Sequence, residues 1–205
     1  MKKLVTMRLI NWHAFVDETI EIKNSVLISG DNGAGKSTIL DAIQFILTCN
    51  KNNFNKAANE NSKRNLTGYV RYKTGREGSE YSRSGDITSH VALEFYEENK
   101  KNYFIIGAVI DSSSETSEKV MFYRIEKHRI KDVTYIDKGI PLDISNFRTM
   151  HRNKSIQPYN SYGEAKKDFL NKFGRLGEKF NELLPKALAF KPIKDIKDFV
   201  YQYIL

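Results

Sequence analysis

A run of nine residues contains the residue types and the spacing that could do chemistry. Residues 30–38 read Gly-Asp-Asn-Gly-Ala-Gly-Lys-Ser-Thr, which fits the pattern G-x-x-x-x-G-K-[ST]. The apolar run 25–29 precedes it and a helical pattern follows it, which is the setting that a phosphate-binding loop needs. A glycine-rich turn before an ordinary helix would explain the glycines but not the Lys-Ser pair. The sequence therefore predicts a loop that binds the phosphates of a nucleotide.

Each residue type in this loop has a physical reason. Three glycines can take positive φ angles without a Cβ clash, so that successive N–H groups point inward at an anion. The helix that begins near Lys36 adds the positive end of its dipole. We expect the Lys36 ammonium to lie between the β- and γ-phosphates as the catalytic charge, and the Ser37 hydroxyl to bind Mg²⁺. The residues predicted to contact the nucleotide in the loop are Gly30, Asp31, Asn32, Gly33, Ala34, Gly35, Lys36, Ser37 and Thr38.

The elements around the loop follow from hydrophobic periodicity. Residues 4–10 and 15–22 alternate apolar with polar side chains, which predicts two half-buried strands. The more continuous apolar run 26–28 predicts a central strand that leads into the loop. Apolar residues dominate 37–48, which predicts a mostly buried helix of about three turns.

The rest of the chain changes character twice. Residues 49–62 are rich in Asn and Lys and are expected to be irregular or weakly helical, and residues 63–86 are basic and punctuated by Gly and Ser. Strand patterns joined by short polar links then predict an antiparallel sheet, and helical patterns follow it. The predicted strands are 87–96, 103–110, 119–130 and 133–136, with a turn at 97–102 and a loop tip at 111–118. The predicted helices are 162–173, 176–188 and a last one with its apolar face in 193–204.

Composition limits the class of protein. The chain has 205 residues, 40% of them apolar and 28% charged, which is enough to build a core and argues against disorder. No stretch approaches the ~20 apolar residues of a membrane span, and no apolar signal peptide follows Met1. Cys49 is the single cysteine, so an internal disulfide is impossible and a cytoplasmic location is expected. The net charge of +8 favours polyanionic partners.

The order of these pieces resembles a known family. A strand that ends in Leu-Ile-Asn-Trp-His at 9–13, a second strand, and the loop followed by Ile-Leu-Asp-Ala-Ile at 39–43 resemble the N-terminal half of an ABC-type ATPase head. The resemblance is to the SMC, SbcC and RecF group of DNA-handling ATPases. Short phrases at 66–71, 85–95 and 188–193 resemble the MukB-like and JetC-like proteins of bacterial condensin and Wadjet plasmid-defence systems.

This resemblance implies a fold and a set of partners. The fold would be an α/β P-loop NTPase head, with strands, loop and loop helix at 1–50, a basic loop region at 51–86, an antiparallel β subdomain at 87–137, and a helical lobe leading towards a coiled coil at 138–205. In the family, a C-terminal half beyond the coiled coil carries the signature, the Walker B acidic pair and the switch histidine, and two heads enclose two ATP molecules. The implied cofactors are ATP and Mg²⁺. The implied partners are the C-terminal half, a second head in a homodimer, kleisin-type or other accessory subunits, and double-stranded DNA, with no membrane.

Some family motifs are absent from the sequence. There is no Leu-Ser-Gly-Gly signature, and no run of four apolar residues is followed by Asp-Glu. Asp111 ends the apolar run 105–110, but Ser112 follows where the catalytic Glu belongs, and the hairpin-like surroundings favour a strand end. Gln44 and Gln202 are the two weak candidates for the family's Q-loop glutamine. We therefore expect this chain alone to bind nucleotide but hardly to hydrolyse it.

Two further groups of residues have functional and ordinary interpretations. Trp12 and His13 fall where the family places groups beside the adenine or the ribose, and packing or surface roles are the alternatives. Asp41 lies one turn beyond Ser37, where either a helix-surface role or an indirect contact with the site is open. Basic residues with interleaved tyrosines suit a DNA backbone, although a solvated loop has the same composition. The residues predicted to contact DNA are Arg64, Arg71, Lys73 and Arg76.

Three other functions stay open at the level of sequence. A self-contained GTPase would need Asn-Lys-x-Asp, and residues 50–53 lack the Asp, while a kinase would need an arginine lid and a second Asp near the loop. A transporter nucleotide-binding domain would carry its signature in the same chain. A structural DNA-binding module could use the loop merely to hold phosphate, and the variant Lys36→Ala separates it from an ATP-dependent protein.

Overall fold

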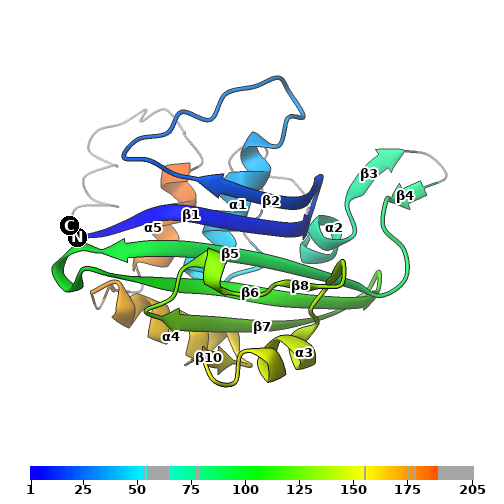
Figure 1. Ribbon diagram of the computed structural model, residues 1–205. Coiled ribbons are helices and arrows are strands. Elements are labelled where there is room, and N and C mark those ends of the chain that lie inside the picture. Colours follow the sequence, from blue (N-terminus) through cyan, green and yellow to red (C-terminus); the bar gives the residue numbers. More distant parts are fainter. Residues whose placement is uncertain are drawn as a thin grey trace, which may run out of the picture.

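A six-stranded antiparallel sheet forms the centre of the protein (Figure 1). The computed structural model describes residues 1–52, 54, 65–76, 79–154, 156–174, 176–177 and 179–188. Across the sheet, the strands lie in the order β10 (Ile156–Tyr159), β7 (Ser117–Glu126), β6 (Asn102–Ser114), β5 (Ile87–Glu97), β1 (Lys2–Trp12) and β2 (Phe15–Glu21). The first strand of the chain is therefore internal, and the second lies at an edge.

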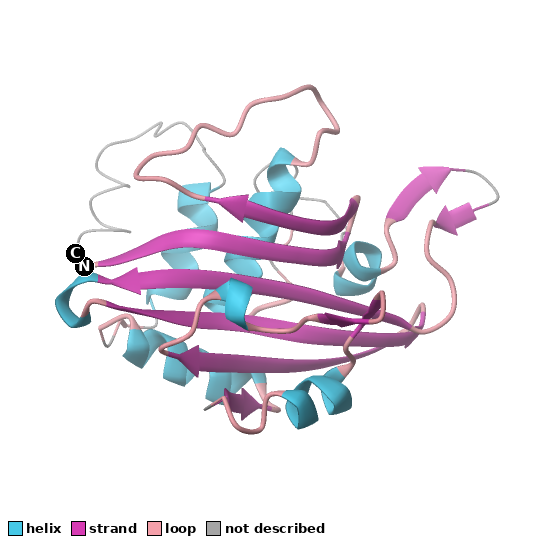
Figure 2. Ribbon diagram, in the orientation of Figure 1, coloured by secondary structure: helices cyan, strands magenta, loops and turns pink. Residues whose placement is uncertain are grey.

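The two faces of the sheet carry different elements (Figure 2). One face packs against α1 (Lys36–Thr48), α2 (Leu66–Val70) and α4 (Tyr162–Lys172), and α5 (Lys179–Leu188) lies beside α1. The opposite face packs against η2 (Ile130–Asp132) and α3 (Ile144–Met150), next to the two-residue strands β8 (Ile136–Asp137) and β9 (Ile140–Pro141). A separate hairpin, formed by β3 (Lys73–Arg76) and β4 (Ser79–Tyr81), follows α2. The short helix η1 (Glu98–Lys100) lies in the turn between β5 and β6. Among the described residues, no helix is long and apolar enough to cross a membrane.

Burial on both faces explains the continuous apolar run in β6. Phe104, Ile106 and Ala108 face the helical side, whereas Ile105 and Val109 face the side of α3. Successive side chains of a strand point to opposite faces, so a strand covered on both sides reads as apolar throughout. The prediction of an antiparallel sheet in this part of the chain is confirmed.

The predicted central strand at 26–28 is wrong. The structure assigns no strand there, and the side chains of Val26, Leu27 and Ile28 are 50%, 90% and 36% exposed. The segment leaves the edge strand β2 and runs as an open loop to α1 (Figure 1). A strand needs a hydrogen-bonded neighbour, and among the described residues none lies beside this run.

Other boundaries moved for local reasons. The strand predicted at 119–130 ends at Glu126, where Lys127 takes a positive φ of 58° and the chain turns into η2. The predicted strand 133–136 is reduced to β8, and β6 continues to Ser114 through half of the predicted loop tip. The basic stretch contains α2 and the β3–β4 hairpin, and the predicted helical lobe contributes β10 to the main sheet. The predicted last helix at 193–204 lies outside the described residues.

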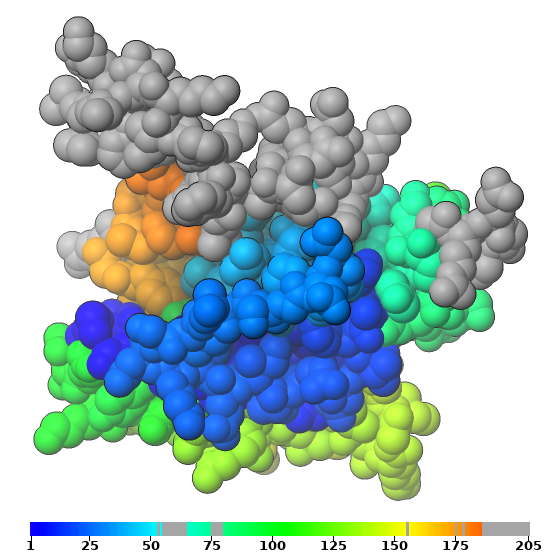
Figure 3. All heavy atoms as spheres, turned by 90° about the horizontal axis from the view of Figure 1, so that it is seen from above, coloured from blue at the N-terminus to red at the C-terminus, as the bar shows by residue number. Residues whose placement is uncertain are grey.

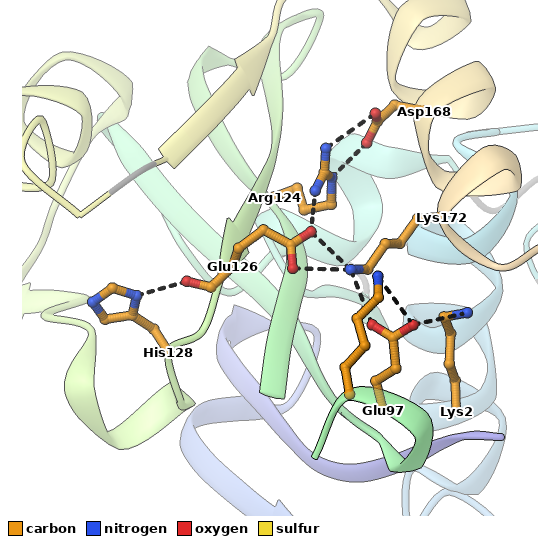
Figure 4. A network of polar contacts seen from close by, with 8 residues as sticks. Lys2, Glu97, Arg124, Glu126, His128, Asp168 and Lys172 are labelled. Carbon is orange, nitrogen blue, oxygen red and sulfur yellow. Dashed lines mark hydrogen bonds and ion pairs between the residues drawn. The ribbon is translucent and has the colours of Figure 1, made fainter. Parts of the chain in front are cut away.

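An ion-pair network fastens α4 to the sheet (Figure 4). The Lys172 ammonium lies 2.8 Å from Glu126 and 3.3 Å from Glu97, and the Arg124 guanidinium lies 2.6 Å from Asp168. Arg124 also contacts Glu126, so one chain of charges joins β5, β7 and α4. The side chain of Lys172 is only 11% exposed, which limits screening of its pairs by solvent. This network holds the helical layer in place beside the loop helix.

Candidate nucleotide-binding site

The predicted phosphate-binding loop joins the edge strand β2 to α1. Figure 3 shows this segment running across the surface of the molecule above the sheet. Three of its residues, Gly30, Gly33 and Gly35, have φ angles of 151°, 90° and 93°. Side chains rarely tolerate such angles, so the observed path explains why these positions are glycines. The local shape of the loop agrees with the sequence prediction.

The first turn of α1 presents backbone amides without a competing cap. Gly35 is the N-cap residue in a left-handed conformation, and no side chain accepts a capping hydrogen bond from this helix end. The first turn also contains no acidic residue. The Ile39 amide is already bonded to the Gly35 carbonyl, at 3.1 Å, so the regular helix begins directly behind the loop. Such an end attracts an anion through its N–H groups and its dipole.

Neighbouring side chains restrict two of the glycines further. A Cβ atom on Gly35 would lie 3.0 Å from Cζ of Phe15, the first residue of β2. A Cβ atom on Gly30 would lie 3.2 Å from the Cβ of Ala34. A Cβ on Gly33 would meet nothing within 4 Å, so only its φ angle requires glycine. The loop is thus held close against the start of the sheet's edge strand.

The first turn of α1 also carries the positive charge of Lys36 and the hydroxyl group of Ser37. The Lys36 ammonium donates hydrogen bonds to the carbonyls of Gly30, at 2.6 Å, and of Asp31, at 2.9 Å. Lys36 therefore bends back over the loop, and Ser37 follows it in the first turn of α1. These groups fit Mg²⁺–ATP by their chemistry: amides and an ammonium for the phosphates, and a hydroxyl oxygen for the metal. Within the described residues, no group of three or more His, Cys, Asp and Glu is placed to hold a metal ion by itself.

Of the two interpretations of Trp12, contact with the nucleotide and packing, the structure supports packing. The side chain of Trp12 is fully buried and stacks on the rings of Phe45 and Tyr69, with centroid distances of 5.8 and 4.7 Å. Its indole N–H donates to the carbonyl of Thr38, at 3.1 Å. A fully buried indole cannot stack on adenine. Trp12 therefore supports the loop helix from behind.

His13 is partly exposed and stays a candidate for contact with the nucleotide. It lies in the tight turn between β1 and β2 with a positive φ of 51°. Its amide donates to the Tyr69 carbonyl at 2.6 Å, and its ring lies 4.7 Å from that of Tyr72. These contacts tie the turn to α2.

The structure also corrects Arg71 as a DNA contact. Its guanidinium is buried, with only 3% of the residue exposed, and donates to Ser112, Ser114 and Gly85 at 2.9–3.0 Å. Lys73 is exposed on β3 and pairs with Glu80 at 2.5 Å. That hydrogen bond raises the pKa of Lys73. Two of the predicted contacts, the residue Arg64 and the side chain of Arg76, lie outside the described residues.

The weaker candidates for site residues were Asp111, Gln44 and Gln202, and the contacts of Asp111 are with the fold. Asp111 accepts hydrogen bonds from the Thr88 hydroxyl, at 2.8 Å, and from the Ile144 amide, at 3.1 Å. Burial raises the pKa of Asp111 although both hydrogen bonds act in the opposite direction. The strand-end interpretation of Asp111 is wrong, because Asp111 lies within β6, opposite Thr88 and Lys119, and its carboxylate joins this strand to α3. Gln44 is buried in α1, and Gln202 lies outside the described residues.

Sequence reasoning missed the residues that hold the loop in place. Phe15 packs on Gly35, and the hydroxyl of Tyr69, a residue of α2, donates a hydrogen bond to the carboxylate of Asp41 in α1. Their aromatic character carried no signal alone, because aromatic residues are common in any core. Tyr69 belongs to one of the short phrases that resembled the SMC group, and this was the available hint. Asp41 is buried, so its helix-surface interpretation is wrong.

Comparison with known proteins agrees with the prediction of a phosphate-binding loop. Residues 4–61 match the family described as the P-loop containing region of AAA domain. Over 120 residues, the chain is 30% identical to the chromosome partition protein Smc of Coxiella burnetii (strain RSA 493 / Nine Mile phase I). That match covers 51% of this chain and 10% of the Smc protein. Residues 4–61 are therefore similar to the P-loop region of AAA domains, and the chain is similar to a short part of an Smc protein.

Proposed function

We propose that this chain is the ATP-binding half of an SMC-like ATPase head. The observation that carries the proposal is the uncapped first turn of α1, with Gly35 left-handed at its start and the Lys36 ammonium folded over the loop. The match to a P-loop region and the similarity to Smc support the same assignment. Because the chain spans only about a tenth of the Smc relative, the activity of a whole head is part of the proposal.

The residues of the loop would act mainly by electrostatics. The amides of 33–37 and the Lys36 ammonium would bind the β- and γ-phosphates, and the Ser37 hydroxyl would hold the metal. Bound Mg²⁺ would supply charge neutralisation on the phosphate oxygens. Since these groups are fixed in place before the reaction, they would stabilise the developing charge without reorganising. The remaining loop residues, Asp31, Asn32, Ala34 and Thr38, would shape this cradle around the phosphates.

An exposed apolar run supports the need for a second half. The side chains of Leu27 and Val26 are 90% and 50% exposed. In the sequence they lie between the edge strand β2 and the loop. Three successive apolar residues without a neighbouring strand, in the described part of the chain, fit a strand that pairs with another polypeptide segment. We propose the C-terminal half of the head as that segment, bringing the signature and the Walker B pair. A second head would complete the site in a homodimer.

DNA handling is the final part of the proposal. A MukB-like or JetC-like protein would use kleisin-type or other accessory subunits and double-stranded DNA, in condensin-type translocation or plasmid defence. A net charge of +8 is compatible with a DNA partner. Of the four residues predicted to contact DNA, Lys73 on β3 is the one whose described side chain is exposed.

Calorimetric titration with Mg²⁺–ATP tests the nucleotide site. Lys36→Ala should weaken binding by at least about tenfold, because a charged hydrogen-bond donor to the phosphates is lost. Lys131→Ala is the matched control, since Lys131 is an exposed lysine of η2 on the opposite face of the sheet. The wild-type chain alone should turn over ATP very slowly. Absence of binding by a folded wild-type chain, or rapid turnover by it, would contradict the proposal.

A salt titration tests the DNA contact. Neutralising Lys73 as Lys73→Gln should reduce the slope of log affinity against log salt by about one unit for a phosphate contact. Lys138→Gln is the control, because this exposed lysine lies between β8 and β9 on the other face. Arg71 is left intact, since its burial would confuse loss of binding with loss of folding. An unchanged slope would remove the hairpin from the DNA path.

A further inference from the structure

One buried tyrosine connects the loop helix to the sheet. Tyr69 is 1% exposed and belongs to the short helix α2. Its hydroxyl donates to the carboxylate of Asp41, which is itself 4% exposed. Its carbonyl accepts a hydrogen bond from the amide of His13, at 2.6 Å. Tyr69 therefore bridges α1 and the turn between β1 and β2.

The ring of Tyr69 reaches α1 by a second route. It stacks on Trp12 with centroids 4.7 Å apart and planes 22° apart, and Trp12 also stacks on Phe45 at 5.8 Å. The Trp12 indole donates to the Thr38 carbonyl at 3.1 Å. The two routes meet α1 at positions 38, 41 and 45, which have the spacing of one helix face. That face is the one turned towards the sheet.

These contacts control the part of α1 that would bind the nucleotide. Thr38 lies one residue after Ser37, and Asp41 lies four residues after Ser37, on the neighbouring turn of the same side. No side-chain cap fixes the first turn, so its direction depends on the contacts behind it. Small displacements of binding groups weaken binding strongly, because the donors no longer point at the charge.

We propose that Tyr69 is a positioning residue for the nucleotide site. Its hydroxyl acts through Asp41 and its ring acts through Trp12, and together they fix the first two turns of α1 so that the loop amides and Ser37 meet the phosphates and the metal. This inference rests on the proposed function, because it assumes that the loop binds Mg²⁺–ATP. Tyr69 itself touches neither the nucleotide nor the metal.

Two variants and one control test the role of the hydroxyl. Tyr69→Phe keeps the ring and removes the donor, and Asp41→Ala removes the same hydrogen bond from the other side. Each should weaken Mg²⁺–ATP binding about three- to tenfold, the factor expected for one lost hydrogen bond. Thr88→Val is the control, because the Thr88 hydroxyl donates to the Asp111 carboxylate at 2.8 Å on the opposite face of the sheet. It should lower the melting temperature as the test variants do, without changing nucleotide affinity.

The single tryptophan gives a spectroscopic readout that folding stability alone would not change. Trp12 holds the carbonyl of Thr38, so Mg²⁺–ATP should alter its emission in the wild-type chain. The change should be smaller in Tyr69→Phe and unaltered in Thr88→Val. In the Asp41→Ala background, Tyr69→Phe should cause no further loss of affinity, because the hydroxyl acts through that carboxylate.

The outcomes separate this inference from the proposed function. If Tyr69→Phe binds Mg²⁺–ATP as the wild type does, or loses affinity equally with and without Asp41, the inference is overturned and the nucleotide site stands. If the folded wild-type chain binds no Mg²⁺–ATP, the proposed function falls and this inference falls with it. Weaker binding and a smaller emission change in Tyr69→Phe, both absent in Thr88→Val, support the role of Tyr69.

Discussion

Replacement of Gly35 by alanine separates two reasons for a glycine in the loop. The φ angle of Gly35 is 93°, and a residue with a Cβ atom pays about 1–2 kcal/mol in a left-handed conformation. The new Cβ atom would also lie 3.0 Å from Cζ of Phe15, whereas ordinary carbon contacts are about 3.5–4.0 Å long. Gly33 has nearly the same φ angle, 90°, but nothing within 4 Å of its Cβ position. Gly33→Ala is therefore the matched control for backbone strain alone.

These numbers give a ranked series of affinities. If the observed loop binds the phosphates, the strain in Gly33→Ala should weaken Mg²⁺–ATP binding about 5- to 30-fold. Gly35→Ala should weaken it further, because the ring of Phe15 must also move. Phe15 is half-buried on the edge strand, so the ring can yield at a modest additional cost. Adding Phe15→Ala to Gly35→Ala should bring the affinity back to the level of Gly33→Ala.

Titration calorimetry on the wild-type chain and the three variants, with melting curves for each, is the assay. The loop is largely exposed, so we expect the melting temperatures to change little while the affinities change. Equal affinity of Gly35→Ala and the wild-type chain would refute the reasoning, because it would mean that binding does not use the observed loop. Failure of Phe15→Ala to improve binding in the Gly35→Ala background would refute the steric part alone.

The remaining predictions concern the stability of the fold that holds the loop, and urea unfolding measures all of them. Burial lowers the pKa of His90 from 6.5 to about 3, so only the unfolded chain takes up this proton between those pH values. Stability should fall by up to about 1.4 kcal/mol per pH unit below pH 6.5, and His90→Gln should flatten that slope; an unchanged slope would contradict it. Gly107→Ala should cost about 3 kcal/mol or more, since its Cβ would lie 2.5 Å from the Tyr123 hydroxyl and 2.7 Å from the Val91 carbonyl. Lys172→Met should cost about 1–3 kcal/mol, less at high salt, by leaving Glu126 and Glu97 without this cation (Figure 4); a loss no larger than that of Lys3→Met, which breaks an exposed pair with Glu98, would contradict it.

The sequence predicts those parts of the fold that depend on local pattern. The helix predicted at 37–48 is α1, and the strands predicted at 4–10, 87–96 and 103–110 are β1, β5 and β6. Periodicity reports which side chains are buried, and in these elements the neighbours that bury them lie within the described chain. The turn at 97–102 was also predicted correctly, because a short polar link between two antiparallel strands can adopt few other conformations.

The failures at 26–28 and at Trp12 have a common physical cause. An apolar run predicts burial, but Leu27 has no neighbour in the described chain and is 90% exposed. Family position favours a nucleotide contact for Trp12, but its ring is fully buried and stacks on Phe45 and Tyr69. In both cases the outcome is decided by which segment from elsewhere lies beside the residue, and periodicity carries no information about that. Arg71 is the same case, because the carbonyls of Gly85, Ser112 and Ser114 that bind it are distant in sequence.

The candidate site therefore has two sources of order with different origins. The glycines give the loop its local path, whereas Phe15 and Trp12, from separate strands, fix where that path lies. Within the described residues, the segment on the other side of the loop has no such support, since Ile28 is exposed only two residues before Gly30. A partner strand that pairs with 26–28 would order the loop from its unsupported side. By linkage, any factor by which such pairing raises the affinity for Mg²⁺–ATP is also the factor by which the nucleotide strengthens the pairing, so the two binding events would favour each other.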